Sequence, residues 1–235
     1  MSRFDVITFD CYGTLIDWES GIRNSFQRIL RETGANPDLG DKALELYEDE
    51  ERRIEREKPH VPYRNVLSKT ALALSRRIGW DLKESLSSFL AEDLPNWTPF
   101  TDTNSALPRL AKGHVLGILS NTDNDLLGET MKHLKAKFDT IVTAEHVKSY
   151  KPAFAHFEKA YELIGDRRWV HVAGSQYHDI EPAATLGIRA IWVNRKEGGL
   201  LRNYAKDQVS QVVDLNQLAE QLDLDQVLTG NPNDI

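Results

Sequence analysis

The sequence contains one cysteine, Cys11, among its 235 residues. A single thiol excludes an intrachain disulfide and is typical of a protein from a reducing compartment. Cys11 follows Asp10 directly, at the end of an apolar run. Because side chains alternate along a strand, Cys11 is turned away from Asp10, and we interpret it as a small packing residue.

Long apolar runs and an excess of positive charge are also absent. No stretch reaches the ~18 apolar residues of a membrane-spanning helix, and no basic region followed by an apolar stretch opens the chain. We therefore expect a cytoplasmic protein with no membrane partner. The net charge of -7 argues against a nucleic-acid partner, because phosphate binding needs a concentrated basic surface. A small anionic substrate needs only one or two local cations and stays compatible with this charge.

The clearest local pattern lies at the start of the chain. Val6-Ile7-Thr8-Phe9 is a short apolar run that predicts a buried strand, and the strand stops at Asp10. A carboxylate in that place costs free energy unless it is paired or does chemistry. Ligands of open α/β sheets bind at this edge. The alternative is that Asp10 only caps the turn that Gly13 and Thr14 introduce.

Residues 17–98 show helical spacing and no strand-like alternation. Apolar residues recur at helix spacing in 22–30, 44–47, 63–78 and 82–90. The run of mixed charges over 48–58 is most simply a solvated helix face, because acids and bases alternate at i,i+3 and i,i+4. Prolines at 95 and 99 mark a crossover. We predict a helical insertion over 17–98.

The remaining chain alternates helices and strands. Strands are expected at 115–119, 140–143, 169–173 and 190–193, and helices at 107–110, 126–138, 154–164 and 180–186; the tail, 215–235, is expected to be partly helical and then polar. This rhythm indicates a parallel sheet with helices on both faces. The predicted fold class is α/β: a Rossmann-like, doubly wound core of residues 1–16 and 99–235 with an inserted helical domain.

Polar residues follow four of these predicted elements. They are Asp10, Ser120 with Asn121, Lys151 and Asp179, and the carboxyl ends of parallel strands share one edge of a sheet. Taken singly, each has a structural interpretation: Ser120 and Asn121 as a helix cap, Lys151 as a surface lysine, and Asp179 as a first-turn acid. Their convergence on one edge favours a site.

The chemistry of these residues fits together. Asp10 can act as a carboxylate nucleophile that forms an ester with the substrate, and Lys151 keeps it ionised by charge proximity. The hydroxyls of Thr14 and Ser120 and the amide of Asn121 can donate to a substrate anion or a leaving group. Asp179 can orient Lys151, activate water or bind a metal.

Four segments carry a resemblance to a known family. Asp10-Cys11-Tyr12-Gly13-Thr14-Leu15, Leu119-Ser120-Asn121, Tyr150-Lys151-Pro152 and the segment that ends at Asp179 resemble the four motifs of the haloacid dehalogenase superfamily. The helical insertion resembles the superfamily's cap. The resemblance implies that Asp10 attacks the substrate and that water hydrolyses the aspartyl ester.

Two branches of the superfamily differ in the residues near the nucleophile. Magnesium-dependent phosphatases carry a second Asp two positions after the nucleophile as general acid, where this chain has Tyr12. They also carry an Asp that helps to hold magnesium, where this chain has Gly174. The pattern from Asp10 to Leu15 resembles the metal-free 2-haloacid dehalogenases, whose halide leaves without a proton. A phosphatase would hold Mg²⁺ with Asp10 and Asp179, which is a thin ligand set.

The dehalogenase branch has further features that this chain meets only in part. Its cap arginine, which cradles halide or carboxylate, has no clear counterpart; the candidates are Arg52, Arg53, Arg56 and Arg64. At a position where that branch carries a tyrosine, this chain has Phe157. In the fourth motif Ser175 is a match, whereas an expected Asn corresponds to Gln176 or His178, and His178 can either tune water activation or lie exposed in a loop.

The resulting prediction is a hydrolase that displaces halide from a small 2-haloalkanoic acid without a cofactor. The catalytic residues are Asp10, Lys151 and Asp179, and the substrate-binding residues are Tyr12, Thr14, Ser120, Asn121 and Ser175. One alternative is a magnesium-dependent phosphatase acting on a small phosphate ester. Another is a catalytically weak member of the family that serves as a binding protein. The cap helices can also supply the contacts of a homodimer.

Overall fold

The computed structural model describes residues 4–196, 201, 204–205 and 207–229, and its centre is a parallel sheet of six strands. The strands are β1 (Val6–Phe9), β2 (Val115–Ser120), β3 (Thr140–Thr143), β4 (Trp169–Ala173), β5 (Arg189–Val193) and β6 (Val209–Val212), in the order β3-β2-β1-β4-β5-β6. The chain therefore winds outward from β1 in both directions. This places the topological switch point beside β1, where open α/β sheets bind their ligands.

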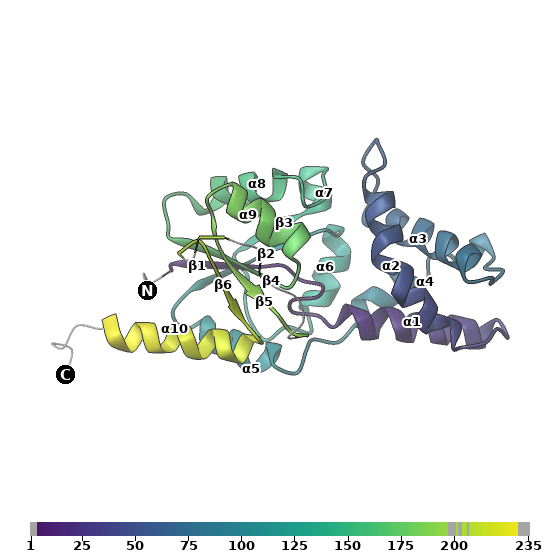
Figure 1. Cartoon of the computed structure of the whole chain (residues 1–235), viewed down its shortest axis with the longest axis horizontal. Coiled ribbons are helices and arrows are strands. Elements are labelled where there is room, and N and C mark those ends of the chain that lie inside the picture. Colours follow the sequence, from purple (N-terminus) through teal and green to yellow (C-terminus); the bar gives the residue numbers. More distant parts are fainter. Residues whose placement is uncertain (1–3, 197–200, 202–203, 206, 230–235) are drawn as a thin grey trace.

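Helices cover both faces of this sheet (Figure 1). The helices α7 (Ala144–Val147), α8 (Ala155–Ile164) and α9 (Glu181–Thr185) lie on one face, and α5 (Thr103–Leu110) and α10 (Leu215–Thr229) lie on the other. The helix α6 (Asn124–Met131) follows β2. The predicted α/β fold with a doubly wound sheet is confirmed. None of the helices within the described residues is long and apolar enough to cross a lipid bilayer.

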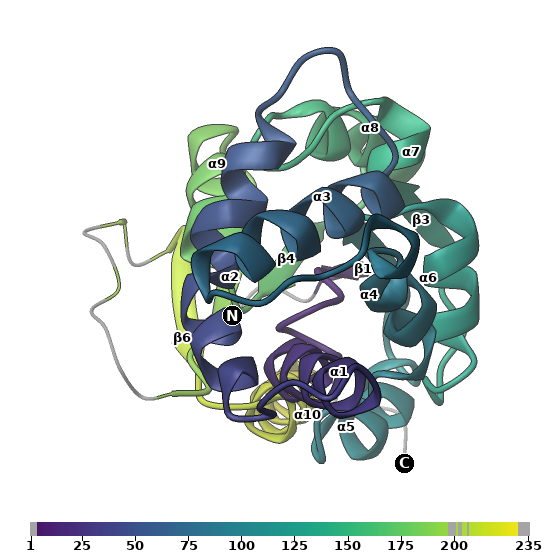
Figure 2. The same ribbon diagram turned by 90° about the vertical axis from the view of Figure 1, so that its right-hand side faces the viewer.

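The segment between β1 and α5 forms a separate group of helices, which we call the cap. It consists of α1 (Trp18–Glu32), α2 (Leu39–Glu55), α3 (Tyr63–Arg77), η1 (Glu84–Leu86), α4 (Phe89–Asp93) and η2 (Leu94–Asn96). Viewed from the cap side, α1, α2 and α3 surround the end of β1 (Figure 2). The cap therefore lies over the carboxyl edge of the sheet.

The chain enters and leaves the cap at one place. Ile16 and Pro99 form an antiparallel bridge, Asp17 N donates to Thr98 O at 2.9 Å, and Phe100 N donates to Leu15 O at 3.0 Å. Asp17 then caps α1 through its side chain, which accepts from Ser20 N. The two crossing segments are thus paired with each other.

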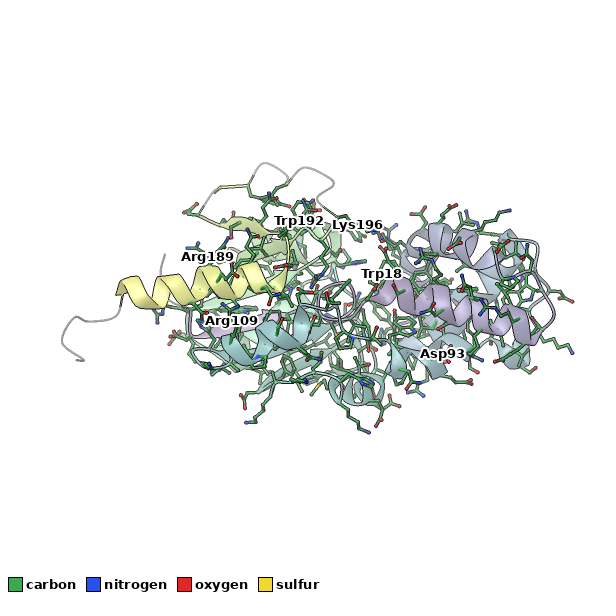
Figure 3. All side chains as sticks on the ribbon, turned by 90° about the horizontal axis from the view of Figure 1, so that it is seen from below. Trp18, Asp93, Arg109, Arg189, Trp192 and Lys196 are labelled. Atoms are coloured by element: carbon green, nitrogen blue, oxygen red, sulfur yellow. The ribbon has the colours of Figure 1, made fainter. Side chains whose placement is uncertain are left out.

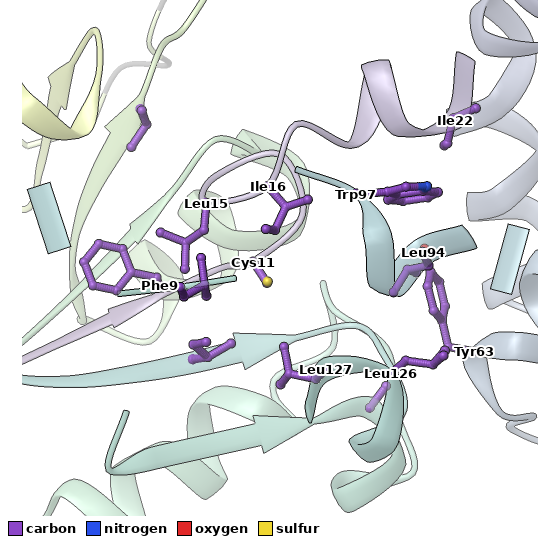
Figure 4. Packing of buried hydrophobic residues seen from close by; sticks show 14 of the residues in the cluster. Phe9, Cys11, Leu15, Ile16, Ile22, Tyr63, Leu94, Trp97, Leu126 and Leu127 are labelled. Carbon is purple, nitrogen blue, oxygen red and sulfur yellow. The ribbon is translucent and has the colours of Figure 1, made fainter. Parts of the chain in front are cut away.

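One apolar cluster continues from the sheet into the cap (Figure 4). Phe9 and Leu15 lie on the sheet side, Ile16 lies at the crossing, and Trp97 and Ile22 continue the cluster on the cap side; all five are 5% exposed or less. Cys11 belongs to the same cluster and is fully buried, so it packs as expected. A second cluster around Leu119 and Phe157 fills the space between the other face of the sheet and α8 and α9.

Several element boundaries differ from those predicted. The strand β6 was missed because its four residues, Val-Ser-Gln-Val, give only a short alternation at the edge of the sheet. The single helix predicted over 82–90 is instead η1 followed by α4, and the helix predicted over 126–138 ends at Met131. The tail is helical to Thr229, and residues 230–235 of the predicted tail lie outside the described residues.

Candidate active site

Asp10 lies directly after β1, at the switch point of the sheet, and is 8% exposed. Its Oδ2 accepts from Thr14 Oγ1 at 2.8 Å, and its Oδ1 accepts from Lys151 Nζ at 2.9 Å. Thr14 Oγ1 in turn accepts from Gly174 N at 2.9 Å. These contacts fix the orientation of the Asp10 carboxylate.

Lys151 joins the two predicted acids. Its Nζ donates to Asp10 Oδ1, to Asp179 Oδ1 at 2.6 Å and to Leu119 O at 2.8 Å, so all three protons of the ammonium are used. The side chain is 1% exposed. Burial lowers the pKa of Lys151, but the two carboxylates outweigh burial and raise the pKa above its ordinary value. Lys151 is therefore a fixed positive charge between Asp10 and Asp179.

Asp179 has a second partner that the sequence analysis missed, namely His171. Its Nε2 lies 3.0 Å from Asp179 Oδ1, and its Nδ1 lies 2.9 Å from Thr8 Oγ1, to which Trp169 Nε1 donates. Burial raises the pKa of Asp179, but Lys151 and His171 reverse this and hold the pKa below its ordinary value. The only signal in the sequence was a histidine in the middle of an apolar strand.

The pKa of Asp10, the candidate nucleophile, is shifted in the opposite direction. Burial is the largest influence on Asp10 and raises its pKa, the charge of Asp179 adds to this, and Lys151 and Thr14 oppose it. A carboxylate whose charge is poorly solvated is a better nucleophile than one in water. Lys151 and Thr14 are the groups that favour the ionised form of Asp10, which is the form that can attack carbon.

A cavity of about 690 Å³ opens between the core and the cap. Its lining includes seven of the eight predicted site residues; the exception is Thr14, which lies behind Asp10. Figure 3 labels Trp192 and Lys196 on the core and Trp18 in the first turn of α1, three residues that also line this cavity. The structure thus brings the sequence-predicted residues to one place.

The predicted substrate-binding residues differ in whether their polar atoms are already hydrogen-bonded. Ser120 Oγ is fully buried and has no hydrogen-bond partner among the residues that the structure describes. Asn121 is occupied: its Oδ1 accepts from Lys151 N at 2.7 Å, and its Nδ2 donates to Lys151 O at 3.1 Å and to Glu55 Oε1 at 3.2 Å. Ser120 is therefore ready to bind a ligand, whereas Asn121 holds the Lys151 loop.

Tyr12 and Ser175 contribute in other ways. The Tyr12 hydroxyl lies 2.9 Å from Thr130 Oγ1, so its ring rather than its hydroxyl is available to a ligand. Burial raises the pKa of Tyr12 far above its ordinary value, and the phenol stays neutral. Ser175 Oγ accepts from His178 N at 3.1 Å and caps the turn that carries Asp179.

Of the four candidate arginines, Arg52 is the one that lines the cavity. It is bonded to Glu48, and its guanidinium lies 5.0 Å from the centre of the Tyr177 ring. Arg53 pairs with Glu50, Arg56 donates to Tyr177, and Arg64 pairs with Asp123 and Asp125. The sequence analysis did not single out two other arginines of the cavity, Arg23 and Arg195.

The interpretation of residues 48–58 as a solvated helix face was wrong for Glu51 and Glu55. Both line the cavity, and the Glu55 side chain is only 7% exposed. Glu51 Oε1 accepts from Tyr47 at 2.9 Å and from Tyr63 at 2.6 Å. The missed signal was the spacing of Tyr47, Glu51 and Glu55, which puts them on one side of α2.

A magnesium ion does not fit the residues at this site. The Oδ1 atoms of Asp10 and Asp179 both bind the Lys151 ammonium, so a cation already lies between the two carboxylates. The third ligand position of the phosphatases is Gly174, where a Cβ would lie 2.5 Å from Gly13 O. An aspartate cannot occupy that position unless the Gly13 backbone moves. Among the described residues, no group of three or more His, Cys, Asp or Glu could hold a metal ion.

Residues 7–193 match the sequence model of the family described as haloacid dehalogenase-like hydrolase. The chain belongs to this family. The resemblance drawn from the four motifs is thereby confirmed, and the protein is a hydrolase of the haloacid dehalogenase superfamily. The match covers both the cap and the strands that carry the site.

This hydrolase is also similar to individual proteins, over different shares of its chain. The haloacid dehalogenase-like hydrolase domain-containing protein 3 of Danio rerio is 37% identical over 107 residues, which is 44% of each chain. Haloacetate dehalogenase H-2 of Moraxella sp. (strain B) is 21% identical over 222 residues, covering 91% of this chain and 93% of that protein. The L-2-haloacid dehalogenase of Xanthobacter autotrophicus has the same fold, with a TM-score of 0.78 at 18% identity over 94% of this chain and 99% of the other.

Proposed function

We propose that this hydrolase displaces halide from C2 of a 2-haloalkanoic acid through an ester on Asp10. The observation that carries the proposal is the environment of that carboxylate. Asp10 is fixed by Thr14 and Lys151, it lines the cavity, and the residue two positions later has its hydroxyl turned toward Thr130. The site therefore offers a nucleophile without an acid for the leaving group, which suits a halide.

In the first step, an oxygen of Asp10 attacks C2, the new C–O bond forms, and the halide leaves with the electron pair of the C–X bond. The configuration at C2 is inverted. Ser120 Oγ, which has no hydrogen-bond partner in the described part of the chain, binds the substrate carboxylate. Lys151 compensates the negative charge of the carboxylates around it throughout this step.

In the second step, water attacks the carbonyl carbon of the Asp10 ester. Asp179 Oδ2 is a buried oxygen without a hydrogen-bond partner among the described residues, on a residue that lines the cavity, and it orients this water by accepting a hydrogen bond from it. One proton of the water passes to the oxygen on C2, which leaves as the hydroxyl of the 2-hydroxy acid. The other is released to solvent as Asp10 returns to its carboxylate form.

The test is halide release from chloroacetate and 2-chloropropionate, each with and without Mg²⁺. We expect turnover in both conditions, and a loss of roughly 10³-fold or more in Asp10→Asn, because a neutral amide cannot act as the nucleophile. The matched control is Asp139→Asn, which changes an exposed acid paired with Lys137. Full activity of Asp10→Asn would end the proposal. A single turnover in heavy-oxygen water should label Asp10.

The same assay separates the two other candidates. A magnesium-dependent phosphatase would release phosphate from an aryl phosphate, and a chelator would abolish the reaction; the close approach of Gly174 to Gly13 O argues against that reaction. A binding protein would turn over neither substrate class although the core is folded.

The glycine contact has a test of its own. Gly174→Ala should lower the free energy of unfolding by about 1–3 kcal/mol, because the added Cβ would overlap Gly13 O. Gly128→Ala is the control, since nothing lies within 4 Å of the position of its Cβ. Equal stability of the two variants, measured by urea unfolding, would contradict the argument that position 174 cannot carry a metal ligand.

A further inference from the structure

The cap presents two carboxyl groups to the cavity that the reaction at Asp10 does not use. Glu51 and Glu55 lie one turn apart on α2 and both line the cavity. Glu51 is held by the hydroxyls of Tyr47 and Tyr63, and Glu55 is held by the Asn121 amide. All of these hydrogen-bond donors are uncharged, so neither acid has its charge neutralised by them.

No lysine or arginine forms an ion pair with Glu51 or Glu55 within the described chain. Within the described chain, the basic group that comes within ion-pair distance of Glu55 is His178, whose Nε2 lies 3.9 Å from Glu55 Oε2. The charges of Lys151 and Arg52 act on Glu55 from farther away. Burial lowers the pKa of His178 to about 4, so this histidine is neutral at physiological pH. Glu50, next to Glu51 in the chain, does have cationic partners, because it pairs with both Arg53 and Arg77.

The cationic side chains of the cavity wall already have acidic partners. Within the part of the chain that the structure describes, the pairs are Arg23 with Asp41, Arg52 with Glu48, Lys151 with Asp10 and Asp179, Arg195 with Asp102, and Lys196 with Glu19. None of these cations is left over for the cap acids. Arg52 and Lys151 act on the cap acids only from a distance, and burial raises the pKa of both Glu51 and Glu55. The cap acids therefore lack a lysine or arginine ion-pair partner among the described residues.

Two features of the cavity wall bear on what the cavity binds, one on the core side and one on the cap side. On the core side, Ser120 Oγ and Asp179 Oδ2 are buried polar atoms that have no hydrogen-bond partner within the described ranges, on side chains that are 1% exposed or less. On the cap side, the rings of Trp18 and Tyr47 line the cavity with their centres 5.6 Å apart, and Tyr47 bonds Glu51. Carboxylates beside aromatic rings are the surroundings that an ammonium group prefers.

We propose that Glu51 and Glu55 bind an ammonium group of the substrate, so that the substrate is a 2-haloacid whose chain carries an amine at its far end. The chemistry at Asp10 rests on the function proposed above. The cap acids then select the substrate: the reacting carbon lies at the core, and the amine lies between α2 and the aromatic rings. A short haloacid such as chloroacetate reaches only the core half of the cavity.

The test compares ω-amino-2-bromoalkanoates of four to seven carbons with unbranched 2-bromoalkanoates that have a methyl group in place of the ammonium. At the best chain length we expect kcat/KM to be at least about tenfold higher for the amino compound, and this preference to shrink with added salt. The double variant Glu51→Gln/Glu55→Gln should lose the preference, so that its kcat/KM values with the amino and methyl compounds become equal. The control is Glu45→Gln, an exposed acid of the same helix.

Failure of this inference is distinguishable from failure of the proposed function. Equal rates with both series, or a preference that survives in the double variant, would overturn the ammonium site while halide release still supports the reaction. If neither series releases halide, calorimetry with 6-aminohexanoate and hexanoate decides the question. Binding of the amine to the unmodified protein and its loss in the double variant would support the site, and equal binding of the two compounds would overturn it.

Discussion

Two pairs of buried carboxyl groups face one cavity from opposite sides, and their surroundings differ in a single respect. In the core, Asp10 and Asp179 share the Lys151 ammonium. In the cap, Glu51 and Glu55 receive only phenol hydroxyls and an amide. Burial raises the pKa of Glu51 to about 7, whereas Asp179, which is at least as deeply buried, has its pKa lowered by Lys151 and His171. Asp10 lies between these two cases, because burial and the charge of Asp179 raise its pKa although Lys151 opposes them.

The largest effect on stability is expected from removing the cation of the core. Lys151→Met keeps an unbranched side chain that ends before the position of the ammonium, and it leaves two carboxylates facing each other in a buried site. We expect the free energy of unfolding at neutral pH to fall by about 3–5 kcal/mol. The measurement is urea unfolding, and Lys159→Met, which removes an exposed lysine paired with Glu162, is the control. A stability equal to that of the control would show that Lys151 does not compensate these acids.

The cap side is tested through the pH dependence of stability. The pKa of Glu51 is about 7 in the folded state and near its ordinary value of 4.5 in the unfolded state, so the folded state binds more protons between these values. The free energy of unfolding therefore falls as pH rises from about 4.5 to 7, on the order of 2–3 kcal/mol from this group. Glu51→Gln should flatten that interval, whereas Glu45→Gln should not. A profile unchanged in Glu51→Gln would contradict the assignment.

A smaller effect is expected from one of the hydroxyls that hold Glu51. Tyr63→Phe removes a hydrogen bond of 2.6 Å that favours the ionised form of Glu51, so the pKa of Glu51 should rise further. We expect a loss of about 1 kcal/mol at neutral pH and a shift of the pH-dependent interval to higher pH. Tyr161→Phe, at a residue that is 62% exposed, is the matched control and should change neither quantity.

The smallest effect concerns the acid of α2 that does have cations. Glu50 is bonded to Arg53 and Arg77, whose side chains are 58% and 44% exposed. Arg53→Gln leaves Arg77 in place, and exposed pairs contribute little, so we expect a loss below about 1 kcal/mol by thermal unfolding. A loss as large as that of Lys151→Met would mean that exposed cations compensate buried acids as well as buried ones do.

The sequence predicted the core side of the site much better than the cap side, for a physical reason. Asp10, Ser120 and Asp179 follow apolar strands, and the parallel sheet brings strand ends to one edge irrespective of local detail. Glu51 and Glu55 are in a helix rich in both charges, where the choice of buried face depends on the packing of α2 against other helices. The role of His171 could not be predicted for a similar reason, because it depends on contacts with the neighbouring strand and with Asp179.

Finally, the pairing of Ile16 with Pro99 has a consequence for how this architecture diversifies. The two ends of the cap are hydrogen-bonded to each other. The chain therefore leaves and re-enters the core at the same place whether the segment between these ends is long or short. A different module can therefore be inserted at this junction without altering the register of β1 against β2 or β4. Under the function and substrate selection proposed above, the residues for the reaction and those for substrate choice lie in separate stretches of the chain, so that one set can change while the other is preserved.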